Sequence, residues 1–105
     1  MIIDRNLDTV IVGAGFAGMY CLHKQIQDGF NAEIFEKADD VGGTWYWNKY
    51  PGARCDIESM DYSYSFSDDL QQEWNWKEKY GTQPEILEYE RFVSKKFNIR
   101  EKINF

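Results

Sequence analysis

The stretch that decides the fold is TVIVGAGFAG, which runs from Thr9 to Gly18. Its first four residues are all β-branched, and such an uninterrupted run is typical of a strand buried on both faces, as in a parallel sheet. The glycines that follow fit the pattern GxGxxG, and Met19, Leu22 and Ile26 then recur at helical spacing until Gly29. The stretch therefore predicts a strand, a glycine turn and a helix with these three side chains on its inner face.

A second strand is predicted at Ala32 to Glu36. Strand, glycine turn, helix and strand within about thirty residues make a βαβ unit, whose strands are parallel and whose crossover is right-handed. The expected fold class is α/β, with a Rossmann-like unit at its centre. A single domain covering residues 1–105 is the most that this length allows.

The segment from Lys37 to Met60 shows no sustained period, which predicts a long ordered loop with a helical turn. Ser67 followed by two acids predicts the N-cap of a short helix or turn that extends to Tyr80. The last elements are a helix and the beginning of a further strand. We expect Pro84 as the first helical residue, after an N-cap at Thr82 or Gln83, and Asn98 as the end of this helix. Its inner face should carry Ile86, Tyr89, Val93 and Phe97. A new strand is expected at Ile103–Phe105.

Charge and composition exclude several classes of partner. The chain has 18 acidic and 12 basic residues and a net charge of -6, which repels nucleic acid and anionic membrane surfaces. No apolar run is long enough to span a bilayer, and the N-terminus lacks the apolar region of a signal peptide. Cys21 and Cys55 are too few for a disulfide framework and lack the CxxC spacing of a zinc site. We therefore expect a cytoplasmic protein with reduced cysteines and no metal.

The glycine turn predicts a dinucleotide site. Gly13 can form the tight turn, Gly15 leaves the backbone open to a pyrophosphate, and Gly18 lets the helix pack against the strand. Glu36 follows about twenty residues after Gly15, at the end of the second strand, where its carboxylate can accept hydrogen bonds from both ribose hydroxyls. The same carboxylate would repel a 2'-phosphate. The site should hold the ADP part of FAD or NAD, not of NADP, and the turn alone does not choose between the first two.

The aromatic loop VGGTWYWNKYPGARCD, residues 41–56, follows the second strand. Gly42 and Gly43 would let the backbone approach a ligand, and the rings of Trp45, Tyr46 and Trp47 suit the wall of a flavin site. A purely structural aromatic cluster is the alternative for any single ring. The chain is unusually rich in such rings here, because ten of its 18 aromatic residues lie between residues 45 and 80.

These segments together resemble a known family. GAGFAG, the run FEKADDVGGTWYWNKYPGARCDIESMDYSYSF and the run EWNWKEKYGTQPEILEYERFVSKKF are similar to the N-terminal part of the Baeyer–Villiger monooxygenases, flavoproteins of the cyclohexanone and phenylacetone monooxygenase kind. The resemblance covers Asp8 to Phe105. The loop and the QEWNW and QPEIL segments favour this group over the related monooxygenases that oxygenate nitrogen or sulfur, which stay open as an alternative.

The resemblance implies roles for individual residues. By matching position, the expected FAD-binding residues are Gly13, Gly15, Ala17, Gly18, Glu36, Gly43, Thr44, Trp45, Asp56 and Tyr62. Arg54, Cys55 and Asp56 match the segment that comes near the bound nicotinamide nucleotide. Asp56 is also expected to support catalysis, because its counterpart is associated with an active-site arginine from a later domain. The lone His23 is expected to have no catalytic role.

The implied activity is that of a flavin-dependent monooxygenase, an oxidoreductase in which NADPH reduces FAD and O2 supplies the oxygen that converts a ketone to an ester or lactone. The second glycine turn for NADPH, the family's fingerprint between the two nucleotide domains and the catalytic arginine do not occur in these 105 residues. We therefore expect a partial FAD-binding domain, incomplete relative to the family and inactive alone. A non-catalytic FAD- or NAD-binding module, or a half-enzyme that needs the missing C-terminal portion or a partner chain, are the alternatives.

Overall fold

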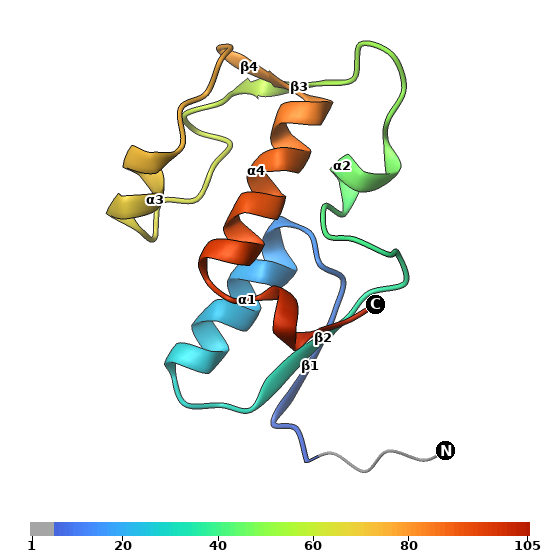
Figure 1. Ribbon diagram of the computed structural model, residues 1–105, viewed down its shortest axis with the longest axis vertical. Helices are drawn as coiled ribbons and strands as arrows, with labels where there is room; N and C mark the ends of the chain where they lie inside the picture. The colour runs from blue at the N-terminus through green and yellow to red at the C-terminus, as the bar shows by residue number, and fades with distance from the viewer. Residues whose placement is uncertain (1–5) are drawn as a thin grey trace.

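Three parallel strands form the main sheet of the computed structural model, which describes residues 6–105. The strands β1 (Thr9–Val12), β2 (Ala32–Phe35) and β5 (Ile103–Asn104) lie in the order β1-β2-β5. Thr9 pairs with Ala32 and Ile34 pairs with Ile103, both in parallel register. The two long helices α1 (Phe16–Gln27) and α4 (Gln83–Lys96) run past the sheet (Figure 1). The predicted α/β fold with a parallel sheet is confirmed.

The core lies on one face of this sheet. Ile11 and Ile34 point into a cluster that also contains Met19 and Leu22 from α1 and Tyr89 from α4. The opposite face is open, because no helix among the described residues covers it, and Val10 and Val12 are 58% and 87% exposed there. The prediction that the first strand is buried on both faces is therefore wrong. A strand with helices on one side only buries every second side chain.

The helix α1 agrees with the sequence pattern except at its end. Met19 and Leu22 are fully buried, but Ile26 is 43% exposed, so the prediction of Ile26 on the inner face is wrong. The strand β2 is so short that the last turn of α1 extends past the packed part of the sheet, where Gly29 then turns the chain with φ of 87°.

The long loop predicted after β2 contains the expected helical turn, α2 (Thr44–Trp47), and also a strand that the pattern did not predict. That strand, β3 (Arg54–Glu58), pairs antiparallel with β4 (Tyr80–Thr82) to form a second, two-stranded sheet. Only Cys55 of β3 is buried, so β3 lacks the alternation that reveals a half-buried strand. The partner β4 has three residues, one of them glycine.

The remaining helices begin close to their predicted residues, but the helix or turn predicted from Ser67 to Tyr80 is too long. The helix ends at Glu73, because Trp74 has an extended backbone and its ring packs on Tyr89, and Tyr80 belongs to β4. Ser67 caps α3 (Asp68–Glu73), where its hydroxyl accepts a hydrogen bond from the Leu70 amide at 3.2 Å. Thr82 is the N-cap of α4, and Pro84 is the second rather than the first helical residue. Asn98 follows α4 with φ of 57°, as expected of a residue that ends a helix. A 3₁₀ turn η1 (Arg100–Lys102) then leads into β5, at the predicted strand.

Most rings between residues 45 and 80 pack inside the protein. Phe16 lies in the centre of an aromatic group, with its ring centroid 5.0 Å from that of Tyr62, edge to face, and 5.1 Å from that of Tyr64. Trp74 and Trp76 contact Tyr89 of α4 at 5.3 and 4.9 Å. The structural alternative therefore accounts for these rings, which fill the space between α1, α4 and the second sheet.

No helix among residues 6–105 combines the length and the apolar character that crossing a bilayer requires.

Candidate nucleotide-binding site

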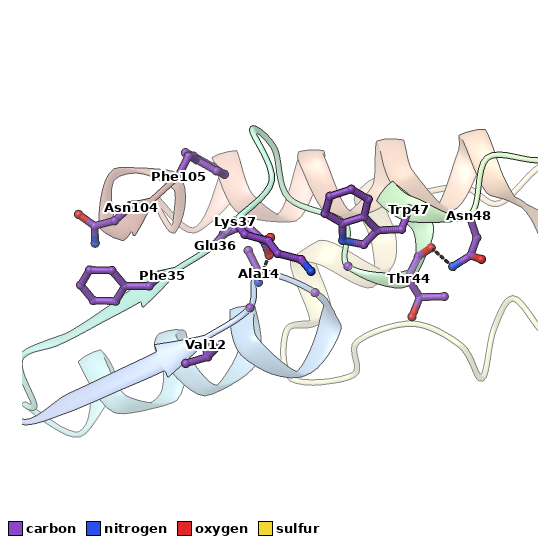
Figure 2. Close-up of a pocket in the computed structure, with 13 residues that line it drawn as sticks. Val12, Ala14, Phe35, Glu36, Lys37, Thr44, Trp47, Asn48, Asn104 and Phe105 are labelled. Carbon is purple, nitrogen blue, oxygen red and sulfur yellow. Dashed lines mark hydrogen bonds between the residues drawn. The ribbon is translucent and has the colours of Figure 1, made fainter.

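A cleft of about 1020 Å³ opens at the carboxyl ends of the three parallel strands. Val12 ends β1, Glu36 and Lys37 follow β2, and Asn104 and Phe105 lie at the end of β5; all five residues line the cleft (Figure 2). Open α/β sheets bind ligands at this edge, where loops and helix N-termini converge. The position of the cleft thus agrees with the dinucleotide site that the glycine turn predicts.

The glycine turn forms the floor of the cleft. Gly13 has φ of 100°, in the left-handed region that favours glycine. Its amide donates to the Phe35 carbonyl at 3.0 Å, which ties the turn to β2. A β-carbon on Gly18 would lie 2.0 Å from the Gly13 carbonyl oxygen, so α1 can pack this closely only without a side chain. The structural roles predicted for Gly13 and Gly18 are confirmed.

The loop after β2 packs against the turn backbone to backbone. The Gly42 amide donates to the Ala14 carbonyl at 3.0 Å. A β-carbon on Gly43 would lie 3.0 Å from the Gly15 Cα, and both Gly42 and Gly43 have positive φ, 135° and 54°. The two glycine segments therefore form one continuous backbone surface, with Gly15 and Gly43 lining the cleft.

Glu36 is almost fully buried at the back of the cleft and is held by two backbone donors. Its Oε1 accepts from the Ala14 amide at 2.8 Å, and its Oε2 accepts from the Ala38 amide at 2.9 Å. Each carboxylate oxygen has two lone pairs, so each can accept one further hydrogen bond from a ligand. The two amides fix the orientation of the carboxylate before any ligand arrives.

The N-terminus of α1 lies beside the turn. Gly15 is its N-cap, and among the described residues no side chain caps it. The N–H groups of the first turn carry a partial positive charge, which favours an anion. A second cavity of about 350 Å³ shares Gly13, Gly15, Gly43 and Thr44 with the large cleft and continues past this helix end. Its other lining residues include the predicted Ala17, Gly18, Trp45 and Tyr62.

The three neighbouring rings of α2 have different surroundings. Trp45 is buried, and its indole nitrogen donates to the Tyr62 hydroxyl at 3.1 Å. The Tyr46 hydroxyl donates to Asp39 at 2.6 Å, at the surface. Trp47 is 56% exposed and lines the large cleft, with the Lys37 ammonium 5.4 Å from its ring centroid (Figure 2). The rings therefore do not form a single wall, since only Trp45 and Trp47 reach the cavities.

The Arg54–Cys55–Asp56 segment lies on β3, and none of its three residues is among those that line the two cavities. Arg54 donates to the Tyr80 carbonyl at 3.1 Å and pairs with Glu78 at 3.5 Å. Cys55 is buried in a small cluster with Trp45, and Asp56 is exposed. Cys55 thus connects the segment to the second cavity through this cluster, in which Trp45 and Tyr62 line that cavity.

Asp40 anchors the loop that contains Gly42 and Gly43. Its carboxylate accepts from Arg91 Nε and Arg100 Nη1, both at 2.7 Å, and from the Val41 amide at 2.8 Å. Burial alone would raise the pKa of Asp40, but the hydrogen bonds from Arg100, Val41 and Arg91 outweigh it and hold the pKa below its usual value. The carboxylate therefore stays ionised and links the loop to both α4 and η1.

Trp47, expected from the sequence as part of a flavin wall, lines the large cleft. The sequence does not predict several other lining residues, namely Val12, Ala14, Phe35, Lys37, Asn48, Asn104 and Phe105. The end of each parallel strand gives a signal for most of them, because a ligand at this edge must contact the residues that close the strands. Asn48 has no such signal. It lies after α2, where its side-chain amide donates to the Thr44 carbonyl at 2.8 Å.

The comparison with known families agrees with this geometry. The model of the NAD(P)-binding Rossmann-like domain matches residues 11–74, which is more than half of the chain. The chain belongs to this family. The matched range runs from β1 of the Rossmann-like domain through both glycine segments, β3 and α3.

The relatives of this Rossmann-like domain are monooxygenases. It is 45% identical over 104 residues to a Baeyer–Villiger monooxygenase of Pseudooceanicola batsensis, and the matched region covers 98% of this chain and 19% of the relative. It is 46% identical over 99 residues to a phenazine N-monooxygenase of Lysobacter antibioticus, and the matched region covers 93% of this chain and 18% of that protein. The solved structure of OTEMO in complex with FAD and NADP is 40% identical, with a TM-score of 0.88 over 94% of this chain and 19% of that one. The chain thus spans about a fifth of the length of these proteins.

Proposed function

We propose that this chain binds the ADP part of FAD in the cleft and forms the FAD-binding part of a monooxygenase of the Baeyer–Villiger type. The observation that carries the proposal is the arrangement of three groups around one cleft: the glycine turn, the uncapped N-terminus of α1 and the oriented carboxylate of Glu36. The OTEMO structure, with FAD and NADP bound, has the same fold, which supports a dinucleotide in this cleft, and the Glu36 carboxylate favours FAD over NADP.

The residues present fit such a cofactor. A pyrophosphate would lie on the first turn of α1, where Gly15 and Ala17 leave the amides accessible and the partial positive charge of the helix favours the anion. The ribose hydroxyls would donate to the free lone pairs of Glu36. An adenosine 2'-phosphate would lie against the same carboxylate, so the cleft favours FAD or NAD over NADP, and NADPH would bind elsewhere in the whole enzyme.

The smaller cavity would receive the part of the cofactor that leads to the flavin. Thr44, Trp45 and Tyr62 line it, and the hydrogen bond between Trp45 and Tyr62 fixes the angle of the indole ring. Bound FAD would supply the redox chemistry, with NADPH as reductant and O2 as the source of the inserted oxygen. The protein would contribute binding, orientation and exclusion of water.

The β3 segment would serve the nicotinamide side. Arg54 and Asp56 are exposed on β3, and Cys55 contacts the cluster that contains Trp45. Asp56 would hold a cationic group from outside these 105 residues, and Arg54 would attract the anionic NADPH. Because the chain spans about a fifth of its relatives' length, we propose that it binds FAD without completing a reaction alone and that the rest of the enzyme supplies the ketone site.

A second candidate is oxygenation of a nitrogen atom. The phenazine N-monooxygenase is as similar to this chain as the Baeyer–Villiger relative, with 46% against 45% identity. Overall sequence identity therefore does not separate the two chemistries. An assay of the whole enzyme with a ketone and with an aromatic N-heterocycle distinguishes ester formation from N-oxide formation.

We also propose that the protein works in the cytoplasm. Both cysteines are free, half-buried Cys21 and buried Cys55, and a reducing compartment keeps thiols in that state.

Titration of the purified chain with FAD tests the proposed cofactor. We expect saturable quenching of flavin fluorescence and competition by ADP. The Glu36→Gln variant should weaken binding by about tenfold or more, because a charged acceptor facing two ribose hydroxyls is lost. Glu58→Gln, an exposed carboxylate on β3, is the matched control and should bind as the wild type does. The proposal fails if FAD shows no saturable binding while NAD binds.

A further inference from the structure

One row of side chains on α4 faces the cleft-forming loop. Gln83, Leu87 and Arg91 are spaced four residues apart, so they lie along one face of the helix. Each contacts a different part of the segment 40–45, which we call the cleft segment. Figure 1 shows α2, at the end of this segment, beside the upper half of α4.

The first contact is at the end of the cleft segment. The Gln83 side-chain amide donates to the Trp45 carbonyl at 2.6 Å, and both residues are buried. The Gln83 backbone amide also donates to the Ala53 carbonyl at 2.9 Å. Gln83 therefore fixes α2 relative to the start of α4 and to the chain that leads into β3.

The second contact is at the middle of the segment. A β-carbon on Gly42 would lie 2.5 Å from Leu87 Cδ1, so the Leu87 side chain packs directly on the Gly42 backbone. The same Gly42 amide donates to Ala14 of the glycine turn. Gly42 is thus enclosed between α4 on one side and the turn on the other.

The third contact is at the start of the segment. Arg91 Nε donates to Asp40 Oδ2 at 2.7 Å, and the other oxygen of Asp40 accepts from Arg100. The Asp40 side chain is 19% exposed, so solvent screens this pair less than a surface ion pair. Since Arg100 lies in η1, just before β5, the same carboxylate also connects the segment to the strand that brings Asn104 and Phe105 to the cleft.

We propose that Gln83 and Arg91 are positioning residues for the nucleotide cleft, which act through the cleft segment without touching the cofactor. Neither residue lines the cleft or the smaller cavity, whereas Gly43, Thr44 and Trp45, which they hold in place, do. The inference rests on the proposed FAD site for its effect on affinity. Its effect on the shape of the segment stands without any ligand.

The experiment compares three variants that each replace a polar side chain of α4 by methionine. Gln83→Met and Arg91→Met remove two of the contacts with the cleft segment. Lys96→Met is the matched control, because Lys96 pairs with Glu73 of α3 at 2.6 Å, away from the cleft. FAD affinity is measured by fluorescence at a temperature well below each Tm, and amide hydrogen exchange at Gly42 is measured without ligand.

We expect Gln83→Met and Arg91→Met to weaken FAD binding by about tenfold or more and to speed exchange of the Gly42 amide by a similar factor, with Lys96→Met unchanged in both. Arg91→Lys, which keeps the charge but not the fixed fork of donors, should recover part of both effects. The inference is overturned if the two variants exchange and bind as Lys96→Met does. If the wild type does not bind FAD, the proposed function fails, and Gly42 exchange alone decides the inference.

Discussion

Gly18 and Gly13 are in backbone contact across the first turn of α1: a β-carbon on Gly18 would lie 2.0 Å from the Gly13 carbonyl oxygen and 3.0 Å from its carbonyl carbon. These two atoms belong to the backbone of a turn in which the Gly13 amide donates to the Phe35 carbonyl of β2, so they cannot move aside as a flexible side chain would. This contact sets the distance between α1 and the end of β1.

Gly18→Ala should therefore destabilise the fold, although alanine is the better helix former by about 1 kcal/mol. We expect a net loss of about 2–3 kcal/mol in the free energy of unfolding, from displacement of α1. Urea denaturation followed by circular dichroism measures it. Ala17→Gly serves as control for helix propensity and should cost about 1 kcal/mol or less. Equal stability of Gly18→Ala and the wild type would contradict the close contact.

Glu90 should make the free energy of unfolding depend on pH. It is fully buried on α4, and neither carboxylate oxygen has a hydrogen-bond partner among the described residues. Burial raises the pKa of Glu90 to about 9. The unfolded chain ionises this group near its usual pKa of about 4.5, so the free energy of unfolding should fall as pH rises between those two values, by at most about 1.4 kcal/mol per pH unit.

Glu90→Gln should remove this pH dependence and be at least as stable as the wild type at pH 8, because an amide carries no charge to desolvate. Denaturant melts at pH 5, 6.5 and 8 measure the slope for both proteins. Glu73→Gln is the control, because Glu73 is an exposed carboxylate that pairs with Lys96, and this variant should leave the slope unchanged. A wild-type slope that persists in Glu90→Gln would show that another group causes it.

His23 should change the free energy of unfolding in the opposite direction. Its ring packs 4.8 Å from Phe66 and 4.9 Å from Phe97. Burial, and then the charge of Lys24, lower the pKa of His23 below 6.5. The folded protein thus favours the neutral ring. The contribution of His23 to the free energy of unfolding should be complete above pH 6.5 and decline as pH falls below it. NMR titration of the imidazole protons checks the direction; a pKa above 6.5 in the folded state would contradict it.

Tyr62→Phe should cost about 1 kcal/mol, because it leaves the buried indole nitrogen of Trp45 without its acceptor. Tyr46→Phe removes an exposed hydroxyl that donates to Asp39 and should cost less than about 0.5 kcal/mol. Thermal melts of the two variants give the comparison. If the proposed FAD site is correct, Tyr62→Phe should also weaken FAD binding, whereas Tyr46→Phe should not.

The sequence predicts the fold best where the signals are local. The β-branched run, the glycine spacing and the helical period lie within residues 9–36, and β1, α1 and β2 follow them closely. The strand β3 escapes prediction because its partner, β4, lies more than twenty residues away and its side chains are mostly exposed. Local pattern carries no information about such pairing.

The same distinction applies to the site. Gly13, Gly15 and Glu36 could be predicted to line the cleft, because a phosphate turn and a ribose acid have fixed spacing. The contacts of Asp40 could not, since Arg91 and Arg100 are 51 and 60 residues away. The sequence also does not predict which rings of α2 lie in the core and which line the cleft, because neighbouring side chains of a helical turn point about 100° apart.

The short strand β5 has a consequence for ligand binding. It is joined to β2 by two residue pairs and by the hydrogen bond from the Glu36 amide to the Asn104 carbonyl at 2.9 Å. The Asn104 side-chain amide also donates to β2, to Glu33 Oε1 at 2.8 Å and to the Ile34 carbonyl at 3.1 Å. These bonds connect the pairing of β5 with the cleft, because Asn104 and its neighbour Phe105 line the cleft. While β5 is detached, Asn104 and Phe105 are missing from the cleft, so only the docked population binds at full strength. The measured affinity is then a product of intrinsic binding and strand docking, and a nucleotide that fills the cleft closes the sheet as it binds.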